Sequence, residues 1–384
     1  MKHKTLIQLF TIFVLFILYY PLSAQETDHR QQAEYYGRLG DQALLSRRYK
    51  EALEHYTRAI SLDPKYEYYI DRSHAYSLLG MDQEALDDSI CALQIEPNGP
   101  RSDEIYYIMA KVYYNFKDIQ KAIDYINKSL LLDPQYGNAY AIRGILYKVS
   151  GQYEEALRDF NKAVELNPKM ASNYGNRASF YLETGEYIKA LNDCNYAVQL
   201  DPKNGRIFYL RSLIYHKMED FNSALLDCNQ AISLDPGNYE YYDQRGKVYY
   251  YRKEYKSAIN DFSKTIEINN TFYDPYYSRA LSYGFLGQFQ HAIDDFSKAL
   301  EFKPESVDIF RNRGVNYYNI HNYQSALEDY NSAIALEPDN IELYNLRGLV
   351  YQRLTGQTTD PVLRDKYRSK ANEDFETAQR LMAE

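Results

Sequence analysis

Tryptophan is absent from the 384 residues, and cysteine occurs only three times, at Cys91, Cys194 and Cys228. With so few cysteines and no CxxC, the fold cannot depend on a disulfide framework. We expect Cys194 and Cys228 to be small buried residues and not a redox pair. Blocks of like charge are also missing, and the net charge is −9. A strongly basic face is therefore not expected, and neither is a nucleic-acid partner.

Motifs for catalysis and phosphate binding are missing as well. The sequence contains no HExxH, no GxxxxGK[ST], no GxSxG and no GxGxxG that opens a helix. Its seven histidines are scattered, and none stands at ligand spacing from a cysteine or another histidine. We therefore predict a protein that is not an enzyme and holds no metal or cofactor. The alternative is an active site assembled in a groove from distant parts of the chain.

The first 24 residues differ from the rest. MKHK is basic, the uncharged run LIQLFTIFVLFILYY follows, and PLSA ends in small residues before Gln25. This is the order of a cleaved signal peptide, here residues 1–24. The run is shorter than the roughly 20 residues of a membrane span, so an uncleaved anchor is the less favoured alternative. We expect export to the periplasm or surface of a bacterium, with no stable membrane span after cleavage.

A unit of about 34 residues repeats along the remaining chain. Its endings, such as LDP, LNP and LEP, place the last residue at Pro64, Pro97, Pro134, Pro168, Pro202, Pro236, Asn270, Pro304 and Pro338. Each unit indicates two amphipathic helices, because apolar residues recur at helical spacing and proline stops the second helix. After a lead-in over residues 25–32, ten units fill residues 33–384, with an insertion near 355–365. We place their starts near residues 33, 66, 103, 137, 171, 205, 239, 273, 307 and 341.

Certain slots of the unit are nearly constant. One slot of the second helix is alanine in all ten units, which implies close helix–helix contact. The fourth unit shows the whole pattern in Tyr140, Gly144, Tyr147, Ala156, Phe160, Ala163 and Pro168. At this spacing the chain resembles the tetratricopeptide repeat family from residue 33 to about 382. The resemblance implies an all-α fold, a right-handed α-solenoid superhelix of about ten helix-turn-helix repeats, here preceded by the signal peptide.

One slot departs from that family, which usually has leucine where eight of the ten units here have arginine. The same eight units have aspartate sixteen residues later, once the insertion of the last unit is discounted. The other two units change at both slots, to Leu39 with His55 and to Met109 with Tyr125. We therefore predict a structural ladder of ion pairs inside the hairpins. Its pairs are Arg72–Asp88, Arg143–Asp159, Arg177–Asp193, Arg211–Asp227, Arg245–Asp261, Arg279–Asp295, Arg313–Asp329 and Arg347–Asp374.

By the same resemblance, the first helix of each unit lines a concave groove, and solenoids bind along such surfaces. Outward slots in units six to nine mix aromatic, apolar and charged residues, types that anchor protein interfaces. The candidate binding residues are Tyr209, Leu213, His216, Lys217, Lys247, Tyr250, Tyr251, Tyr277, Phe285, Arg311 and Tyr318. For any one tyrosine, the alternative role is to fill a seam between helices. The lysine and asparagine clamp with which one subclass of the family holds chaperone C-termini is missing.

These patterns predict a non-enzymatic scaffold or adaptor, exported from the cytoplasm, that binds a peptide or protein segment in the concave groove. The alternative is a glycan-binding accessory protein of the cell envelope that uses stacked tyrosines. The last unit is expected to cap the array, because its outer face is charged and no further unit covers it.

Overall fold

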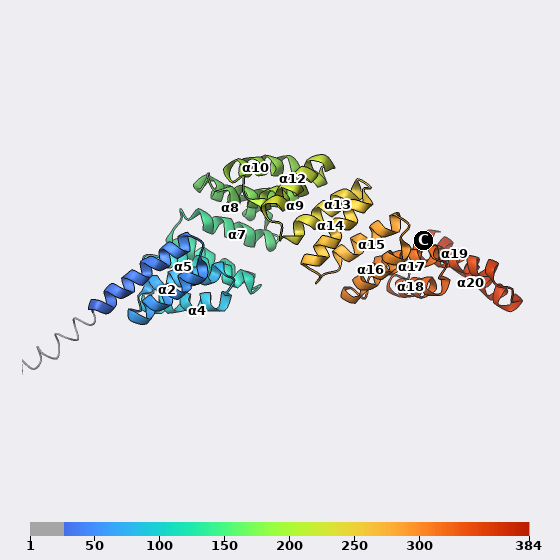
Figure 1. Ribbon diagram of the computed structural model, residues 1–384, viewed down its shortest axis with the longest axis horizontal. Coiled ribbons are helices and arrows are strands. Elements are labelled where there is room, and N and C mark those ends of the chain that lie inside the picture. Colours follow the sequence, from blue (N-terminus) through green and yellow to red (C-terminus); the bar gives the residue numbers. More distant parts are fainter. Residues whose placement is uncertain (1–26, 384) are drawn as a thin grey trace, which may run out of the picture. The chain divides into compact units, whose positions relative to one another are not determined.

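The computed structural model describes residues 27–383, and every regular element in this range is a helix (Figure 1). This confirms the predicted all-α architecture of repeated helix-turn-helix units. None of the helices described is long and apolar enough to cross a lipid bilayer. The predicted signal peptide, residues 1–24, lies outside the described residues.

Consecutive helices pair into hairpins, and the chain forms two compact bodies, one up to Phe180 and one from Tyr181. We call them the N-terminal and the C-terminal body. A helix over residues 27–45 pairs with α2 (Tyr49–Leu62). The next hairpins are α3 (Tyr66–Leu78) with α4 (Asp82–Ile95), α5 (Ser102–Asn115) with α6 (Ile119–Leu132), and α7 (Gly137–Val149) with α8 (Tyr153–Leu166). The boundary falls within α9 (Ala171–Glu183), and α10 (Tyr187–Leu200) follows it. The C-terminal body continues with α11 (Gly205–Lys217) and α12 (Phe221–Leu234), α13 (Tyr239–Tyr251) and α14 (Tyr255–Ile268), α15 (Asp274–Phe285) and α16 (Phe289–Phe302), α17 (Val307–Asn319) and α18 (Tyr323–Leu336), and α19 (Ile341–Gln357) and α20 (Pro361–Ala383).

In nine of the ten hairpins, the turn has one residue in the left-handed region. Gly151 takes this conformation between α7 and α8, with a φ of 75°, as glycine does most readily. Glycine also fills the slot at Gly80, Gly185 and Gly287, but five other turns use Arg47, Lys117, Glu219, Lys253 and His321, all with positive φ. Since non-glycine residues accept this φ, the packing of the two helices imposes the turn.

The core of a hairpin lies between its two helices and is built from matched small and large residues. The repeated alanines are buried in all ten units, at positions 52, 85, 122, 156, 190, 224, 258, 292, 326 and 371. A Cβ atom added to Gly144 would lie 2.8 Å from the ring of Phe160, so this glycine makes room for the ring. In two units the slot of that ring holds Cys194 or Cys228, and both are buried free thiols, as predicted.

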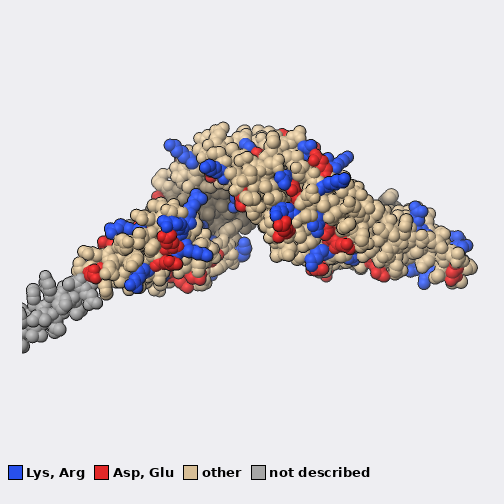
Figure 2. All heavy atoms as spheres, viewed as in Figure 1, with Lys and Arg blue, Asp and Glu red and all other residues tan. Residues whose placement is uncertain are grey.

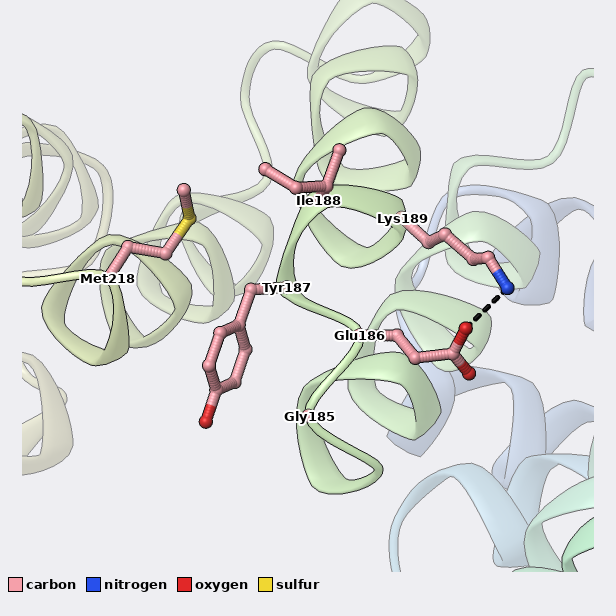
Figure 3. A pocket seen from close by; sticks show the side chains of 6 residues that line it. All are labelled: Gly185, Glu186, Tyr187, Ile188, Lys189 and Met218. Carbon is pink, nitrogen blue, oxygen red and sulfur yellow. Dashed lines mark hydrogen bonds and ion pairs between the residues drawn. The ribbon is translucent and has the colours of Figure 1, made fainter.

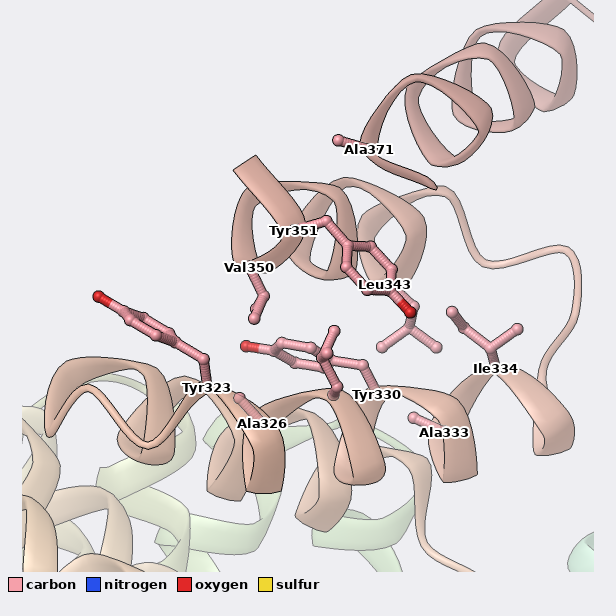
Figure 4. Packing of buried hydrophobic residues seen from close by; sticks show 10 residues of the cluster. Tyr323, Ala326, Tyr330, Ala333, Ile334, Leu343, Val350, Tyr351 and Ala371 are labelled. Carbon is pink, nitrogen blue, oxygen red and sulfur yellow. The ribbon is translucent and has the colours of Figure 1, made fainter. Parts of the chain in front are cut away.

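The inserted residues of the last unit lengthen both of its helices. The helix α19 has 17 residues and α20 has 23, whereas the preceding α17 and α18 have 13 and 14. Leu343 and Val350 of α19 pack on Tyr330 of α18, and Ala371 places α20 against them (Figure 4). Only Ala371, Asp374 and Ala378 of α20 are buried, so most of this helix faces solvent, as a terminal unit requires.

Candidate functional site

The arginine and aspartate slots meet inside the hairpins. Arg211 Nε and Nη2 donate to Asp227 Oδ2 and Oδ1, each over 2.7 Å. The side chains are 17% and 7% exposed. These hydrogen bonds raise the pKa of Arg211, although burial opposes them. The same two-point contact joins Arg72–Asp88, Arg143–Asp159, Arg245–Asp261, Arg279–Asp295, Arg313–Asp329 and Arg347–Asp374. Arg177 and Asp193 belong to different bodies, and their pairing stays a prediction.

Each of these arginines also contacts the preceding hairpin, which the sequence analysis did not anticipate. Arg211 Nη1 donates to Asn195 Oδ1 of α10 over 2.8 Å. The equivalent acceptors are Thr57, Asn127, Asn161, Asn229, Ser263, Ser297 and Asn331. The sequence carries a signal for this contact, because the acceptor stands two residues after the aspartate slot of the preceding unit. In the second unit, the residue at this acceptor position is Ile90, which cannot accept a hydrogen bond through its side chain. The unit that follows has Met109 in place of the arginine.

Aromatic rings cover the guanidinium groups. Arg211 Cζ lies 5.5 Å from the ring centroid of Phe208 and 5.9 Å from that of Tyr215. Rings at the same two slots flank Arg72, Arg143, Arg245 and Arg313. Planar guanidinium groups stack well on such rings. Many of the 43 tyrosines therefore pack between helices. This is the alternative to ligand binding that the sequence analysis gave for a single tyrosine.

Several candidate binding residues are held by neighbours within the C-terminal body. The rings of Tyr209 and Tyr241 are 5.3 Å apart. Lys247 Nζ lies 2.6 Å from a carboxylate oxygen of Asp243. Tyr277 accepts a hydrogen bond from Asn312, Tyr318 accepts one from Arg353, and Arg311 pairs with Asp308 and Glu342. Leu213 is half-buried and Lys217 is exposed.

The other aromatic candidates gather at the hairpin turns of the same body. The imidazole of His216, at the end of α11, lies 5.7 Å from the Phe221 ring of α12. It lies 4.9 Å from the Tyr251 ring of α13. The Phe221 and Tyr251 rings are stacked, with 9° between their planes. Three helices thus supply one aromatic trio.

The trio recurs one repeat later. Tyr250 lies 5.7 Å from the ring of Tyr255 and 5.9 Å from that of Phe285, and the latter two rings are stacked 4.9 Å apart. Tyr250 and Tyr251 join the two trios over 5.7 Å. We call these six residues the aromatic edge: His216, Phe221, Tyr250, Tyr251, Tyr255 and Phe285.

The edge offers exposed rings on a supported base. Tyr251 is 59% and Phe285 61% exposed, while the other four members are half-buried. Phe221 and Tyr255 were missed because the analysis of outward slots considered only first helices. Their signal is an aromatic residue that opens successive second helices, at Tyr187, Phe221, Tyr255, Phe289 and Tyr323.

The edge is largely uncharged. The side chain of Gln244 shares a hydrogen bond of 3.1 Å with His216 Nδ1. Burial lowers the pKa of His216, which favours the neutral imidazole at pH 7. On the face seen in Figure 2, basic and acidic side chains alternate and form no field of one sign. No group of three or more histidine, cysteine, aspartate or glutamate side chains within residues 27–383 could hold a metal ion.

A shallow hollow lies at neighbouring hairpin turns of the C-terminal body. It encloses about 360 Å³ between the turn before α10 and Met218, which follows α11. Tyr187 and Met218 line one side, and the ion pair of Glu186 with Lys189 lines the other (Figure 3). Ile188 is 62% exposed at its rim. Because Tyr187 occupies the slot of Phe221 and Tyr255, the hollow extends the row of turn residues that forms the aromatic edge.

Comparisons with known proteins identify the repeat. Models of the tetratricopeptide repeat match residues 33–66, 103–136, 137–170, 171–204, 205–238 and 273–306, and a TPR repeat model matches 321–354. PilW, described as a widely conserved type IV pilus biogenesis factor, is 17% identical, with a TM-score of 0.51 over 54% of this chain and 96% of PilW. PilF of Pseudomonas aeruginosa is 17% identical, with a TM-score of 0.49 over 58% of this chain and 97% of PilF. YrrB, described as a TPR protein with an unusual peptide-binding site, is 25% identical, with a TM-score of 0.43 over 48% of this chain and 95% of YrrB. The likeness to PilW concerns the fold alone.

Proposed function

Because the chain belongs to the tetratricopeptide repeat family, we propose that it is a non-enzymatic scaffold that binds another protein. The segment it binds lies on the first-helix face of units six to eight and on the aromatic edge. One observation carries this proposal. Six rings form a connected chain, and its members Tyr251 and Phe285 are more than half exposed. Grouped exposed rings are typical of protein interfaces.

The stacking of the edge favours binding over simple exposure. Tyr251 rests on Phe221, and Phe285 rests on Tyr255, so the exposed rings are held in place before a partner arrives. Ordering them on binding then costs little conformational entropy. Burial of apolar area contributes about 25 cal/mol per Å², and anchor residues at such interfaces are worth about 2 kcal/mol or more. Two anchors of this kind would contribute about 4 kcal/mol, and contacts along the first-helix face would add to this.

Export belongs to the same proposal. Its support is the order of basic, apolar and small residues over positions 1–24. A partner in the periplasm or at the cell surface of a bacterium follows from it.

The test is selection of peptides from a random dodecapeptide library on the purified full chain. The affinity of enriched peptides is then measured by fluorescence anisotropy. We expect the double variant Tyr251→Ala with Phe285→Ala to bind at least tenfold more weakly. The control is Phe116→Ala, which removes a ring that is 45% exposed at a turn of the N-terminal body and should not change affinity. Equal affinity of all three proteins would refute the assignment to the aromatic edge.

The two stacked pairs, Phe221–Tyr251 and Tyr255–Phe285, also favour a second candidate function, the binding of glycans, since exposed aromatic faces stack on sugar rings. If no peptide is enriched, affinity electrophoresis through gels that contain polysaccharides is the next experiment. If the polysaccharide slows the migration of the chain, and the same double variant is not slowed, the ligand of the aromatic edge is a glycan and not a peptide.

A further inference from the structure

The turn of the last hairpin projects beyond the turn of the hairpin before it. The helix α19 continues for ten residues after Arg347, whereas α17 ends six residues after Arg313, which occupies the same slot. The helix α20 begins thirteen residues before Asp374, whereas α18 begins six residues before Asp329. At a rise of about 1.5 Å per residue, α19 therefore extends about 6 Å further than α17, and α20 about 10 Å further than α18. In Figure 1 this turn is the far end of the two red helices, away from the end marked C. We call residues 354–368 the projecting tip.

Two adjacent apolar side chains lie at the apex of the projecting tip. Val362 is 76% and Leu363 39% exposed, and both belong to the first turn of α20. Asp360 Oδ1 accepts hydrogen bonds from the backbone N–H groups of both residues, over 2.8 and 3.5 Å. The start of the helix is therefore fixed, and the two apolar side chains are presented to solvent on an ordered support.

Basic residues are in excess around this apex. Positions 353–370 hold five basic and two acidic residues, whereas acidic residues outnumber basic ones by 53 to 44 in the whole sequence. One of the two acids is Asp360, whose carboxylate caps α20. The other, Asp365, lies 3.6 Å from Arg368. The tip therefore has a local positive charge on a chain that is acidic overall.

We propose that the projecting tip docks on the surface of a lipid bilayer that carries anionic phospholipids, independently of the aromatic edge. Arg364, Lys366 and Arg368 are exposed. They lie about 3, 6 and 9 Å behind Val362 along the helix axis. With the tip directed at the bilayer, Val362 and Leu363 enter the boundary between headgroups and acyl chains, and the three basic side chains reach the layer of phosphates.

The shape and the charge of the tip favour a bilayer over a protein partner. The apex is convex, and its basic groups lie at several depths behind it. Lipid phosphates move in a fluid surface and adjust to such an arrangement, whereas a protein would need a socket with a carboxylate fixed at each depth. Because the chain has a net charge of −9, an anionic bilayer repels most of the remaining surface, so attraction is confined to basic places such as this tip.

The test measures hydrogen–deuterium exchange of the full chain by mass spectrometry, alone and with vesicles. The readout has to be local, because the apolar run over residues 6–20 can attach the chain to any bilayer. The first N–H groups of a helix have no acceptor within the helix, so the amides of residues 358–364 exchange readily unless they are covered. Vesicles of phosphatidylcholine mixed with phosphatidylglycerol should slow this exchange at least threefold, and vesicles of phosphatidylcholine alone should slow it much less. No slowing with either vesicle, or equal slowing with both, would overturn the proposal.

Matched double variants test the role of charge. Arg364→Gln with Lys366→Gln should remove more than half of the protection by the anionic vesicles. The control, Lys169→Gln with Lys256→Gln, neutralises two basic residues that are exposed outside the tip, and it should leave the protection unchanged. Added salt should weaken the protection of the parent chain, because it screens exposed charges. An equal loss in the two double variants would reduce the effect to net charge and contradict docking by the tip.

A second pair of variants tests the apolar contact. Val362→Ser with Leu363→Ser should also remove more than half of the protection. The control is Leu131→Ser with Leu226→Ser, which changes side chains that are 81% and 70% exposed on other helices, and its protection should equal that of the parent. Circular dichroism shows whether each variant folds. If the exchange of the tip slows with protein concentration in the absence of vesicles, the occupant is a second copy of the chain and the proposal is wrong.

Discussion

The contact between Arg211 and Asp227 allows a quantitative test of the ladder. Replacing Arg211 by methionine removes two hydrogen bonds of 2.7 Å and leaves the carboxylate of Asp227, 7% exposed, without its counter-charge. Removing one partner of a buried pair costs about 3–5 kcal/mol. Because 17% of the Arg211 side chain is exposed to solvent, we expect the lower end of this range, a loss of about 3 kcal/mol in the free energy of unfolding. The unpaired Asn195 oxygen adds about 1 kcal/mol.

The third unit indicates which double variant should recover this loss. There, Met109 is 3% exposed at the arginine slot, and Tyr125 stacks on Tyr113 at the aspartate slot. Arg211→Met with Asp227→Tyr copies this apolar solution. Since apolar residues can replace a buried ion pair at little net cost, we expect the double variant to regain more than half of the loss.

The assay is urea unfolding followed by circular dichroism, with hydrogen exchange to show whether the loss is confined to α11 and α12. Arg206→Met is the control, because this arginine is exposed on the same helix and should change stability by less than about 0.5 kcal/mol. A double variant no more stable than the sum of the single changes predicts would refute the pairing. Adding Asn195→Ile to the double variant should change stability little. Ile90 occupies the same slot as Asn195, and it precedes the unit in which Met109 replaces the arginine.

Two further predictions concern the hairpin core. Gly144→Ala should destabilise the fourth hairpin by at least about 1 kcal/mol, because its Cβ would lie 2.8 Å from the ring of Phe160. This loss outweighs the better helix propensity of alanine. Urea unfolding measures the change, and a stabilised variant would contradict the prediction. Burial raises the pKa of Cys194 and of Cys228 to about 12, so iodoacetamide at pH 8 should alkylate the half-buried Cys91 much faster than these two thiols in the folded protein. Peptide mass spectrometry over a time course checks the order, and equal rates at all three cysteines would show that the hairpin cores open readily.

Much of the architecture follows from local sequence alone. The regular return of Asn-Pro and Asp-Pro endings, the alanine slot and the apolar spacing predict paired helices whose observed bounds follow the 34-residue period. Even the register of the last unit was evident, since Arg347 still meets Asp374 across 27 residues. These features are predictable because a repeat multiplies each weak local signal, and helix formation depends mainly on neighbours three and four residues away.

The candidate surfaces were only partly predictable. Attention to outward slots of first helices found Tyr250, Tyr251 and Phe285 but not Phe221 and Tyr255, which reach the same edge from second helices. The same slots gave Lys247 as free to bind, whereas it is paired with Asp243. Whether a side chain on a helix surface meets a neighbour depends on the adjacent hairpin, and a single helix does not contain that information.

The amino-acid sequence by itself therefore determined the repeat, the hairpin and the hairpin partner of seven of the arginines, because these contacts recur at constant separations along the chain. Only the tertiary structure decided that Arg211 also holds Asn195, that six rings join into one edge, and that Lys247 is paired with Asp243. These outcomes depend on how consecutive hairpins pack, which brings together side chains from three helices.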